Sequence, residues 1–322
     1  MTQSPESPRQ RLFLLEPQYH ERVWGGQRLR AATPPVGEAW VAGEGSRVAS
    51  GPHAGASVGE LSAQYPEALL GGAARLGGRF PLLIKLLDCA DWLSVQVHPN
   101  DEQARRMVGP GEFGKTEAWH FLEVEPGAAI LAGVKEGTTP EELRRAILAG
   151  EVLEVSQRRE PKEGESLFIP AGTLHALGPG LLLYEVQQTS DTTYRVYDWD
   201  RPASAGRKLH LRESAEVTDA HARAQLTPPP AQGQTEFRAV TCPMFALDVL
   251  TLGAGTAGRG DPAGQSPHLL TVTEGEVRVA CGDEEVTLGQ YDTLLVGAAA
   301  GPYELRASGA ARVLRAGVPA GA

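Results

Sequence analysis

Short runs of alternating apolar and polar residues, broken by glycine and proline, make up most of this chain. Side chains two positions apart on a β-strand point to the same face, so this pattern predicts many short strands. One run, LSVQVHPND at 93–101, places Ser94, Gln96 and His98 on a common face, opposite apolar residues. This polar face is the first candidate for chemistry, although a half-buried strand with a solvated face would show the same alternation.

Only a few stretches predict helices. The clearest is 138–151, where Thr139 can cap the first turn and Glu142 completes a capping box. Shorter helices are expected within 59–71 and 101–108. The sequence therefore predicts a mainly β fold with a few short helices.

Changes in composition suggest where domains begin and end. Residues 1–10 are polar and contain two prolines, which indicates a flexible tail. Residues 226–236, LTPPPAQGQTE, have the composition of a linker. We therefore expect a larger β domain with helical insertions at 11–225 and a smaller β domain at 237–322.

The two expected domains contain a similar stretch. GESLFIPAGTLHAL at 164–177 and GQYDTLLVGAAAGPYEL at 289–305 share a glycine, an apolar strand and a turn of small residues. The second stretch has no histidine where the first has His175. This similarity predicts two related β-barrels, of which only the first carries chemistry.

Composition and charge narrow the class of partner. The 322 residues carry a net charge of −10, which argues against nucleic acid or an acidic membrane as the main partner. Three scattered cysteines predict buried free thiols rather than disulfides or a cysteine zinc site. The N-terminus has no apolar core of a signal peptide, and no apolar run reaches about 18 residues, so we expect a cytoplasmic protein.

Two further stretches supply groups that could bind a metal with the first. In GKTEAWH, Lys115 and Glu117 share a strand face, and in IPAGTLHAL, His175 follows a tight turn. Alone, each would be read as a solvated ion pair or a structural histidine. Together the stretches offer a mixed nitrogen and oxygen donor set that suits Zn²⁺ in an open site, or Fe²⁺ or Mn²⁺: Gln96, His98, Glu117 and His175.

A fourth stretch, QQTSDTTYRVYDWDR at 187–201, places many polar residues along one strand. Arg195 can bind an oxyanion or a phosphate through its planar guanidinium. Asp191 could accept a hydrogen bond from a ligand histidine and fix its tautomer. A salt-bridged edge strand is the alternative interpretation.

In combination, WLSVQVHPND, GKTEAWHFLE, IPAGTLHALGPG and QQTSDTTYRVYDWDR resemble motifs of the type I mannose-6-phosphate isomerases, particularly the short bacterial form. The resemblance covers about residues 12–212 and weakens beyond the linker. It implies two cupin-like jelly-roll β-barrels with a few short helices. The first, over 11–225, would be catalytic, and the second, over 237–322, would be a degenerate copy.

The resemblance also implies an activity and its residues. The family uses one zinc ion per chain, with another divalent metal possible here, to interconvert mannose 6-phosphate and fructose 6-phosphate through an enediol. The family's metal ligands fall on Gln96, His98, Glu117 and His175, and its catalytic arginine and lysine fall on Arg195 and Lys115. The carboxylate behind a ligand histidine resembles Asp191.

These motifs say less about which residues bind the substrate. The like charge of the metal and Arg195 should lower the pKa of Lys115, which would make it an acid/base or else a phosphate ligand. Ser94 could donate a hydrogen bond to the phosphate, or be an ordinary strand serine. A non-catalytic sugar- or metal-binding cupin and a different metal-dependent cupin enzyme stay open as alternatives, and so does the oligomeric state.

Overall fold

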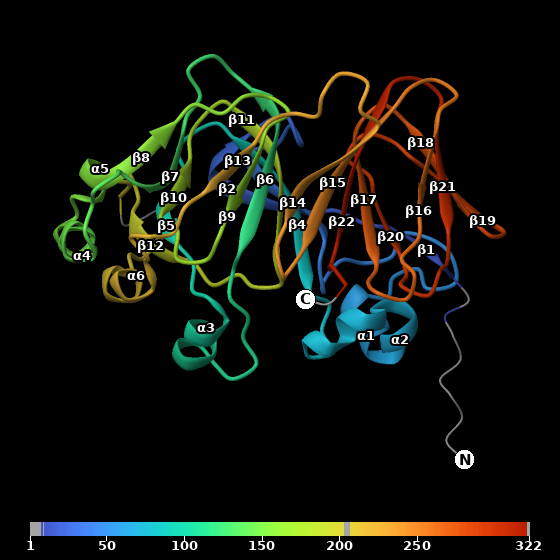
Figure 1. The fold of residues 1–322 in the computed structure, drawn as a ribbon, viewed down its shortest axis with the longest axis horizontal. Coiled ribbons are helices and arrows are strands. Elements are labelled where there is room, and N and C mark those ends of the chain that lie inside the picture. The colour runs from blue at the N-terminus through green and yellow to red at the C-terminus, as the bar shows by residue number, and fades with distance from the viewer. Residues whose placement is uncertain (1–7, 9, 203–206, 321–322) are drawn as a thin grey trace. The chain divides into compact units, whose positions relative to one another are not determined.

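The structure, a computed structural model, describes residues 8, 10–202 and 207–320. Strands dominate it and the helices are short, which confirms the mainly β fold class (Figure 1). Within these described ranges, no helix is both long enough and apolar enough to cross a membrane. The tail expected at 1–10 lies outside the described residues except for Pro8 and Gln10, and the Gln10 side chain is buried.

The chain divides into two compact units. We call 19–39 and 86–229 the central unit, and 1–18, 40–85 and 230–322 the flanking unit. The chain leaves the central unit between Pro229 and Pro230, inside the segment 226–236 that has the composition of a linker. Nearer the N-terminus, the chain also passes between the two units, which the expected boundaries did not include. Residues 11–18 and 40–85 group with the C-terminal residues.

Two sheets build the central unit. The five-stranded sheet has the order β12 (Tyr194–Tyr197), β5 (Val95–Val97), β10 (His175–Leu177), β7 (Ile130–Val134), β8 (Ser156–Arg159). The seven-stranded sheet has the order β13 (Gln225–Thr227), β9 (Ser166–Ile169), β6 (Glu117–Val124), β11 (Leu181–Gln188), β4 (Leu82–Cys89), β2 (Gln18–Gly26), β3 (Val36–Ala42). The helices of this unit are α3 (Asp101–Met107), α4 (Pro140–Ala149), α5 (Val152–Val155) and α6 (Leu211–Val217).

The five-stranded sheet is covered on both faces. On one face, Val95 and Val97 of β5 pack in a cluster with Leu143 and Ile147 of α4. On the other face, side chains of β7 and β10 pack against those of β6, β9 and β11 in the second sheet. Because side chains alternate along a strand, the polar face of LSVQVH points between the two sheets.

The clearest sequence-predicted helix is confirmed. Thr139 caps α4 and its side chain accepts a hydrogen bond from the backbone of Glu142, whose own side chain completes the capping box. The helix expected within 59–71 is instead two short helices, because Pro66 disfavours helical geometry at the residue before it and starts a new helix.

The flanking unit also contains two sheets. The six-stranded sheet has the order β1 (Leu12–Leu15), β20 (Thr293–Val296), β17 (His268–Glu274), β22 (Ala311–Gly317), β15 (Ala246–Leu252), β14 (Glu236–Thr241). The four-stranded sheet has the order β16 (Ala257–Gly260), β21 (Tyr303–Ala307), β18 (Val277–Cys281), β19 (Glu284–Leu288). Two short helices, α1 (Val58–Gln64) and α2 (Pro66–Leu69), and a 3₁₀ turn, η1 (Gly71–Leu76), complete it.

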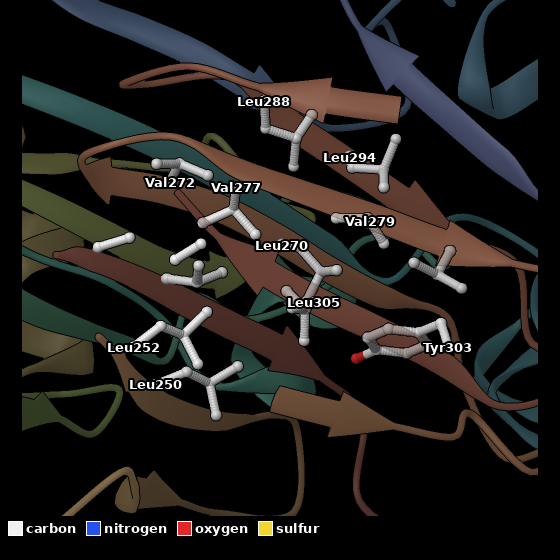
Figure 2. Packing of buried hydrophobic residues seen from close by; sticks show 14 of the residues in the cluster. Leu250, Leu252, Leu270, Val272, Val277, Val279, Leu288, Leu294, Tyr303 and Leu305 are labelled. Atoms are coloured by element: carbon white, nitrogen blue, oxygen red, sulfur yellow. The ribbon is translucent and has the colours of Figure 1, made fainter. Parts of the chain in front are cut away.

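The space between the two sheets of the flanking unit is filled by an apolar core. Leu270 of β17 and Leu250 of β15 lie in one cluster with Val279 of β18 and Leu305 of β21 (Figure 2). Each unit is therefore a pair of packed sheets. Within the described residues none of the four sheets closes on itself as a barrel.

Candidate metal centre

Three buried side chains meet at one end of the central unit. His98 follows β5, Glu117 is the first residue of β6, and His175 is the first residue of β10. One donor atom from each lies within 4.8 Å of the others. The Glu117 carboxylate lies between the imidazoles, with Oε2 3.5 Å from His98 Nε2 and Oε1 3.3 Å from His175 Nε2. The structure thus brings together residues from three separate sequence motifs.

Backbone carbonyls orient both histidines. His98 Nδ1 lies 2.9 Å from the carbonyl oxygen of Thr192, and His175 Nδ1 lies 2.8 Å from that of Thr173. A carbonyl oxygen only accepts, so each Nδ1 carries the proton and each neutral imidazole keeps its lone pair on Nε2. Burial lowers the pKa of His175, and the Lys115 charge lowers it further, which favours this neutral form.

This donor set fits a divalent metal ion. Two imidazole lone pairs and a carboxylate converge on one buried point, and all three side chains are about 1% exposed. Zinc takes nitrogen and oxygen ligands of this kind, and three protein ligands leave a coordination position for water or substrate. The expectation of a mixed nitrogen and oxygen site without sulfur agrees with this geometry.

Gln96 lies beside the three donors, but its amide nitrogen faces them. Gln96 Nε2 is 3.3 Å from His175 Nε2, and Gln96 Oε1 accepts a hydrogen bond from Ser94 Oγ at 3.2 Å. Binding a metal through Oε1 would require the amide to turn over. Ser94, Gln96 and His98 do share one face, as the alternation predicts.

Lys115 occupies the middle of the site. Its Nζ lies 2.5 Å from Glu117 Oε2 and 3.0 Å from His98 Nε2, and the side chain is buried. Burial by itself lowers the pKa of Lys115, but the negative charges of Glu117, Glu185 and Asp191 outweigh it, so the pKa is raised. The expected lowering of this pKa depends on the charge of a bound metal ion and stays a prediction, because the protein groups around the ammonium raise the pKa.

Arg195 lies on the strand next to Gln96 and is paired with it. In the strand register Gln96 pairs with His175 on β10 and with Arg195 on β12, so the three side chains form a row on one face. The Arg195 side chain is half-buried, and its Nε has no hydrogen-bond partner among the described residues. Arg195 is thus placed beside the candidate metal centre with a donor free for an anion.

Asp191 does not have the role that the sequence suggested. It is exposed, and the Nδ1 atoms of His98 and His175 face backbone carbonyls instead. A carbonyl from the neighbouring residue, Thr192, replaces the expected carboxylate. Asp191 contributes one of the negative charges near Lys115.

Sequence reasoning missed two residues near the site. Arg207 donates a hydrogen bond from NH2 to Ser94 Oγ at 2.8 Å, and Glu185 accepts one from Trp119 Nε1 at 3.1 Å. A charged residue inside the apolar run LLLYEV was a usable signal for Glu185. Nothing in the local sequence separates Arg207 from an ordinary surface arginine, because its contact is with a residue 113 positions away.

Comparison with known proteins finds relatives in one family. Residues 12–113 match the family model described as phosphomannose isomerase type I, catalytic domain. A mannose-6-phosphate isomerase of Streptococcus mutans is 36% identical over 299 residues, which cover 88% of this chain and 92% of that protein.

Solved structures of similar fold come from the same family. The crystal structure of the mannose 6-phosphate isomerase from Bacillus subtilis superposes with a TM-score of 0.84 and 29% identity, over 95% of this chain and 99% of that one. A zinc-bound mannose 6-phosphate isomerase has the same fold, with a TM-score of 0.74 and 17% identity over 95% and 99% of the two chains. With these relatives spanning both units, the chain belongs to the mannose-6-phosphate isomerase family.

Proposed function

We propose that this chain is a zinc-dependent aldose–ketose isomerase that interconverts mannose 6-phosphate and fructose 6-phosphate through an enediol. The observation that carries the proposal is the buried group of His98, Glu117 and His175, in which both imidazoles present Nε2 to the carboxylate. The names of the relatives and the zinc in one structural neighbour support the substrate and the metal.

The reaction moves a proton between C1 and C2 of the sugar without net redox change. A zinc ion held by His98, Glu117 and His175, with Gln96 beside them, would polarise the oxygens on these two carbons. Arg195 donates hydrogen bonds to the oxygen on which negative charge develops, since its Nε is free and it lies beside Gln96. The buried surroundings of the site strengthen these interactions.

The position of Lys115 favours one of its two expected roles. The ammonium contacts Glu117 and His98 directly, so it would lie near the oxygens of C1 and C2 of a metal-bound sugar and away from the phosphate on C6. We therefore assign Lys115 to proton transfer at these oxygens rather than to phosphate binding. Its contacts with Glu117 and His98 place the ammonium where it can donate a proton at this end of the sugar.

The alternatives have less support. A non-catalytic sugar- or metal-binding protein would not need Arg195 and Lys115 placed against the same three donors. A different metal-dependent enzyme of this fold would need another substrate, and the relatives supply no other. We also propose a cytoplasmic location, which the free thiols of Cys89, Cys242 and Cys281 support.

A coupled assay tests the proposal. Conversion of mannose 6-phosphate to fructose 6-phosphate is measured before chelation, after chelation and after zinc is restored, with metal analysis of the protein. We expect activity and bound zinc to be lost and regained together. A His120→Ala variant removes a buried histidine of β6 whose Nδ1 contacts Ser166 Oγ, and it should keep its zinc. No turnover with any divalent metal would overturn the proposed function.

A further inference from the structure

A group of arginines lies at the start of β5, away from the three metal donors. The Asp198 carboxylate contacts two of them, Arg201 NH1 at 2.9 Å and Arg207 Nε at 3.4 Å. Arg195 and Arg22 lie near enough to Arg207 for their charges to act on it. Asp198 is buried and makes ion pairs with two arginines of this group.

The turn that carries Asp198 has an unusual backbone. Trp199 and Asp200 both have left-handed dihedrals, with φ of 56° and 54°, which non-glycine residues adopt at a cost of roughly 1–2 kcal/mol each. The Trp199 ring stacks on Trp92 and its Nε1 donates to the Leu93 carbonyl at 2.7 Å. These contacts maintain a strained turn, as is common at binding sites.

The arginines differ in how well their donors are satisfied. Arg201 bonds Asp198, Asp91 and the carbonyl of Trp92. Arg207 uses Nε and NH2, but its NH1 is buried without a hydrogen-bond partner among the residues that the structure describes. The Arg195 Nε is likewise buried without a hydrogen-bond partner among the described residues. The Arg195 Nε is the donor assigned to the developing oxyanion, so the Arg207 NH1 is the buried donor available for a second anionic group.

The group of arginines also carries an excess of positive charge, which favours binding of an anion. Among the described residues, the ion pairs of Arg201 and Arg207 are made with Asp198 and Asp91. Burial and the neighbouring arginine charges, partly offset by Asp198, lower the pKa of Arg207 to about 10. Arg207 stays protonated at neutral pH, and a bound anion would relieve the repulsion between these groups.

The distance from the metal donors suits the far end of a sugar. Arg207 contacts Ser94, Ser94 contacts Gln96, and Gln96 contacts His175, so three hydrogen bonds separate the guanidinium from a metal ligand. In a hexose 6-phosphate, the phosphate is likewise at the opposite end of the carbon chain from C1 and C2. Lys115 touches Glu117 and His98 and is too close to the reacting carbons for this role.

We propose that Arg207 binds the phosphate group of the sugar substrate, and that Asp198 positions the Arg207 guanidinium. This inference rests on the proposed function and adds the residue that distinguishes phosphorylated from unphosphorylated sugars. The unpartnered NH1 group of the planar Arg207 guanidinium can donate to the oxygens of a phosphate monoester.

The test compares Arg207→Met with the unchanged chain, both loaded with zinc. Methionine keeps an apolar stem and removes the charge. We expect KM for mannose 6-phosphate to rise by about 10–100-fold, the size of one lost charge-assisted contact, with kcat within about threefold. Calorimetry should show a similar loss of affinity for inorganic phosphate. Phosphate bound only by the metal would bind both proteins alike and overturn the inference.

Two further variants control for structural effects. Arg28→Met removes another partly buried arginine of the central unit, one that bonds Asp88 and the Leu181 carbonyl, and it should leave KM and phosphate affinity unchanged. Arg207→Lys keeps the charge without the planar donor pair and should raise KM by about 3–10-fold. If Arg207→Met does not fold, Arg207→Lys decides the question, and an unchanged KM there contradicts the inference.

The outcomes separate this inference from the proposed function. Normal turnover with an unchanged KM and phosphate affinity in Arg207→Met overturns the inference alone. Absence of turnover in the unchanged chain, with phosphate binding that still depends on Arg207, overturns the function alone. A fall in kcat or in bound zinc, without a change in KM, assigns Arg207 a structural role and also overturns the inference.

Discussion

The two units use a similar stretch of sequence for different purposes. In the central unit, β9 is followed by a turn and by His175, the first residue of β10. The His175 side chain meets the other two candidate metal ligands, His98 and Glu117. In the flanking unit, β20 is followed by a turn of small residues and Tyr303, the first residue of β21. Tyr303 joins the apolar core (Figure 2). Its hydroxyl pairs with His268 Nδ1 at 2.8 Å.

The difference lies in what the neighbouring strands contribute. Around His175, other strands and loops add Gln96, His98, Glu117 and Lys115. Around Tyr303, they add Leu270, Val279 and Leu305 (Figure 2). A strand–turn–strand of this kind therefore does not make a metal site by itself. It makes one only where several strands place polar side chains on the same inward face.

The largest expected effect comes from removing a metal ligand. His175→Ala should lose bound zinc and reduce isomerase activity by at least about 10³-fold, because the metal supplies several kcal/mol of charge stabilisation. Tyr303→Phe, the corresponding change in the flanking unit, should keep both. Metal analysis and the coupled assay measure the two quantities. Zinc loss in Tyr303→Phe would show that the flanking unit takes part in the site.

A second change separates chemistry from metal binding inside the central unit. Arg195→Ala should retain zinc and lose kcat by about 10²–10³-fold, as expected for one donor to a developing oxyanion. Steady-state kinetics and metal analysis of the same preparation check this. Near-normal turnover would refute the oxyanion role of Arg195.

In the flanking unit the expected effect is on stability. Leu270 is fully buried in the apolar core, so Leu270→Ala should reduce the free energy of unfolding by about 2–5 kcal/mol. Zinc content and kcat should stay unchanged. Val286→Ala, at a partly buried position against the same cluster, should cost less. Denaturant unfolding measures the free energy of unfolding of both variants. An equal loss in the two would contradict the central place of Leu270 in this apolar core.

The smallest effect concerns acid stability of the flanking unit. Burial, with the Arg315 charge, lowers the pKa of His268 to about 4 from an ordinary value of 6.5. Between these pH values the unfolded chain takes up a proton that the folded chain does not, so stability falls as the pH falls, by up to about 3 kcal/mol. His268→Gln should show a smaller loss over this range in unfolding measured at several pH values. Parallel pH curves for the two proteins would be the contrary result.

Much of the site was predictable because it depends on local patterns. Alternation alone placed Ser94, Gln96 and His98 on one face, and that face does point between the two sheets. The capping box at Thr139 was equally readable, since it needs residues only three positions apart. Such signals depend on the chain's own geometry over a few residues.

Other features depend on contacts between distant residues. The pairing of β1 with β20 joins Leu12 to Val296, and it groups an N-terminal strand with the C-terminal half of the chain. The histidine tautomers are set by the carbonyls of Thr192 and Thr173, where the sequence had suggested Asp191. A backbone carbonyl exists at every residue, so no sequence pattern marks the one that is used.

The sequence by itself determined the mainly β class, the motifs that carry the donors and the face on which the first of them lies. Only the tertiary structure decided that Lys115 is surrounded by carboxylates, that Asp191 is exposed and that Arg207 reaches Ser94. The physical reason is that strand periodicity fixes the direction of a side chain over a few residues. Its charge environment, in contrast, depends on which distant strands pack beside it.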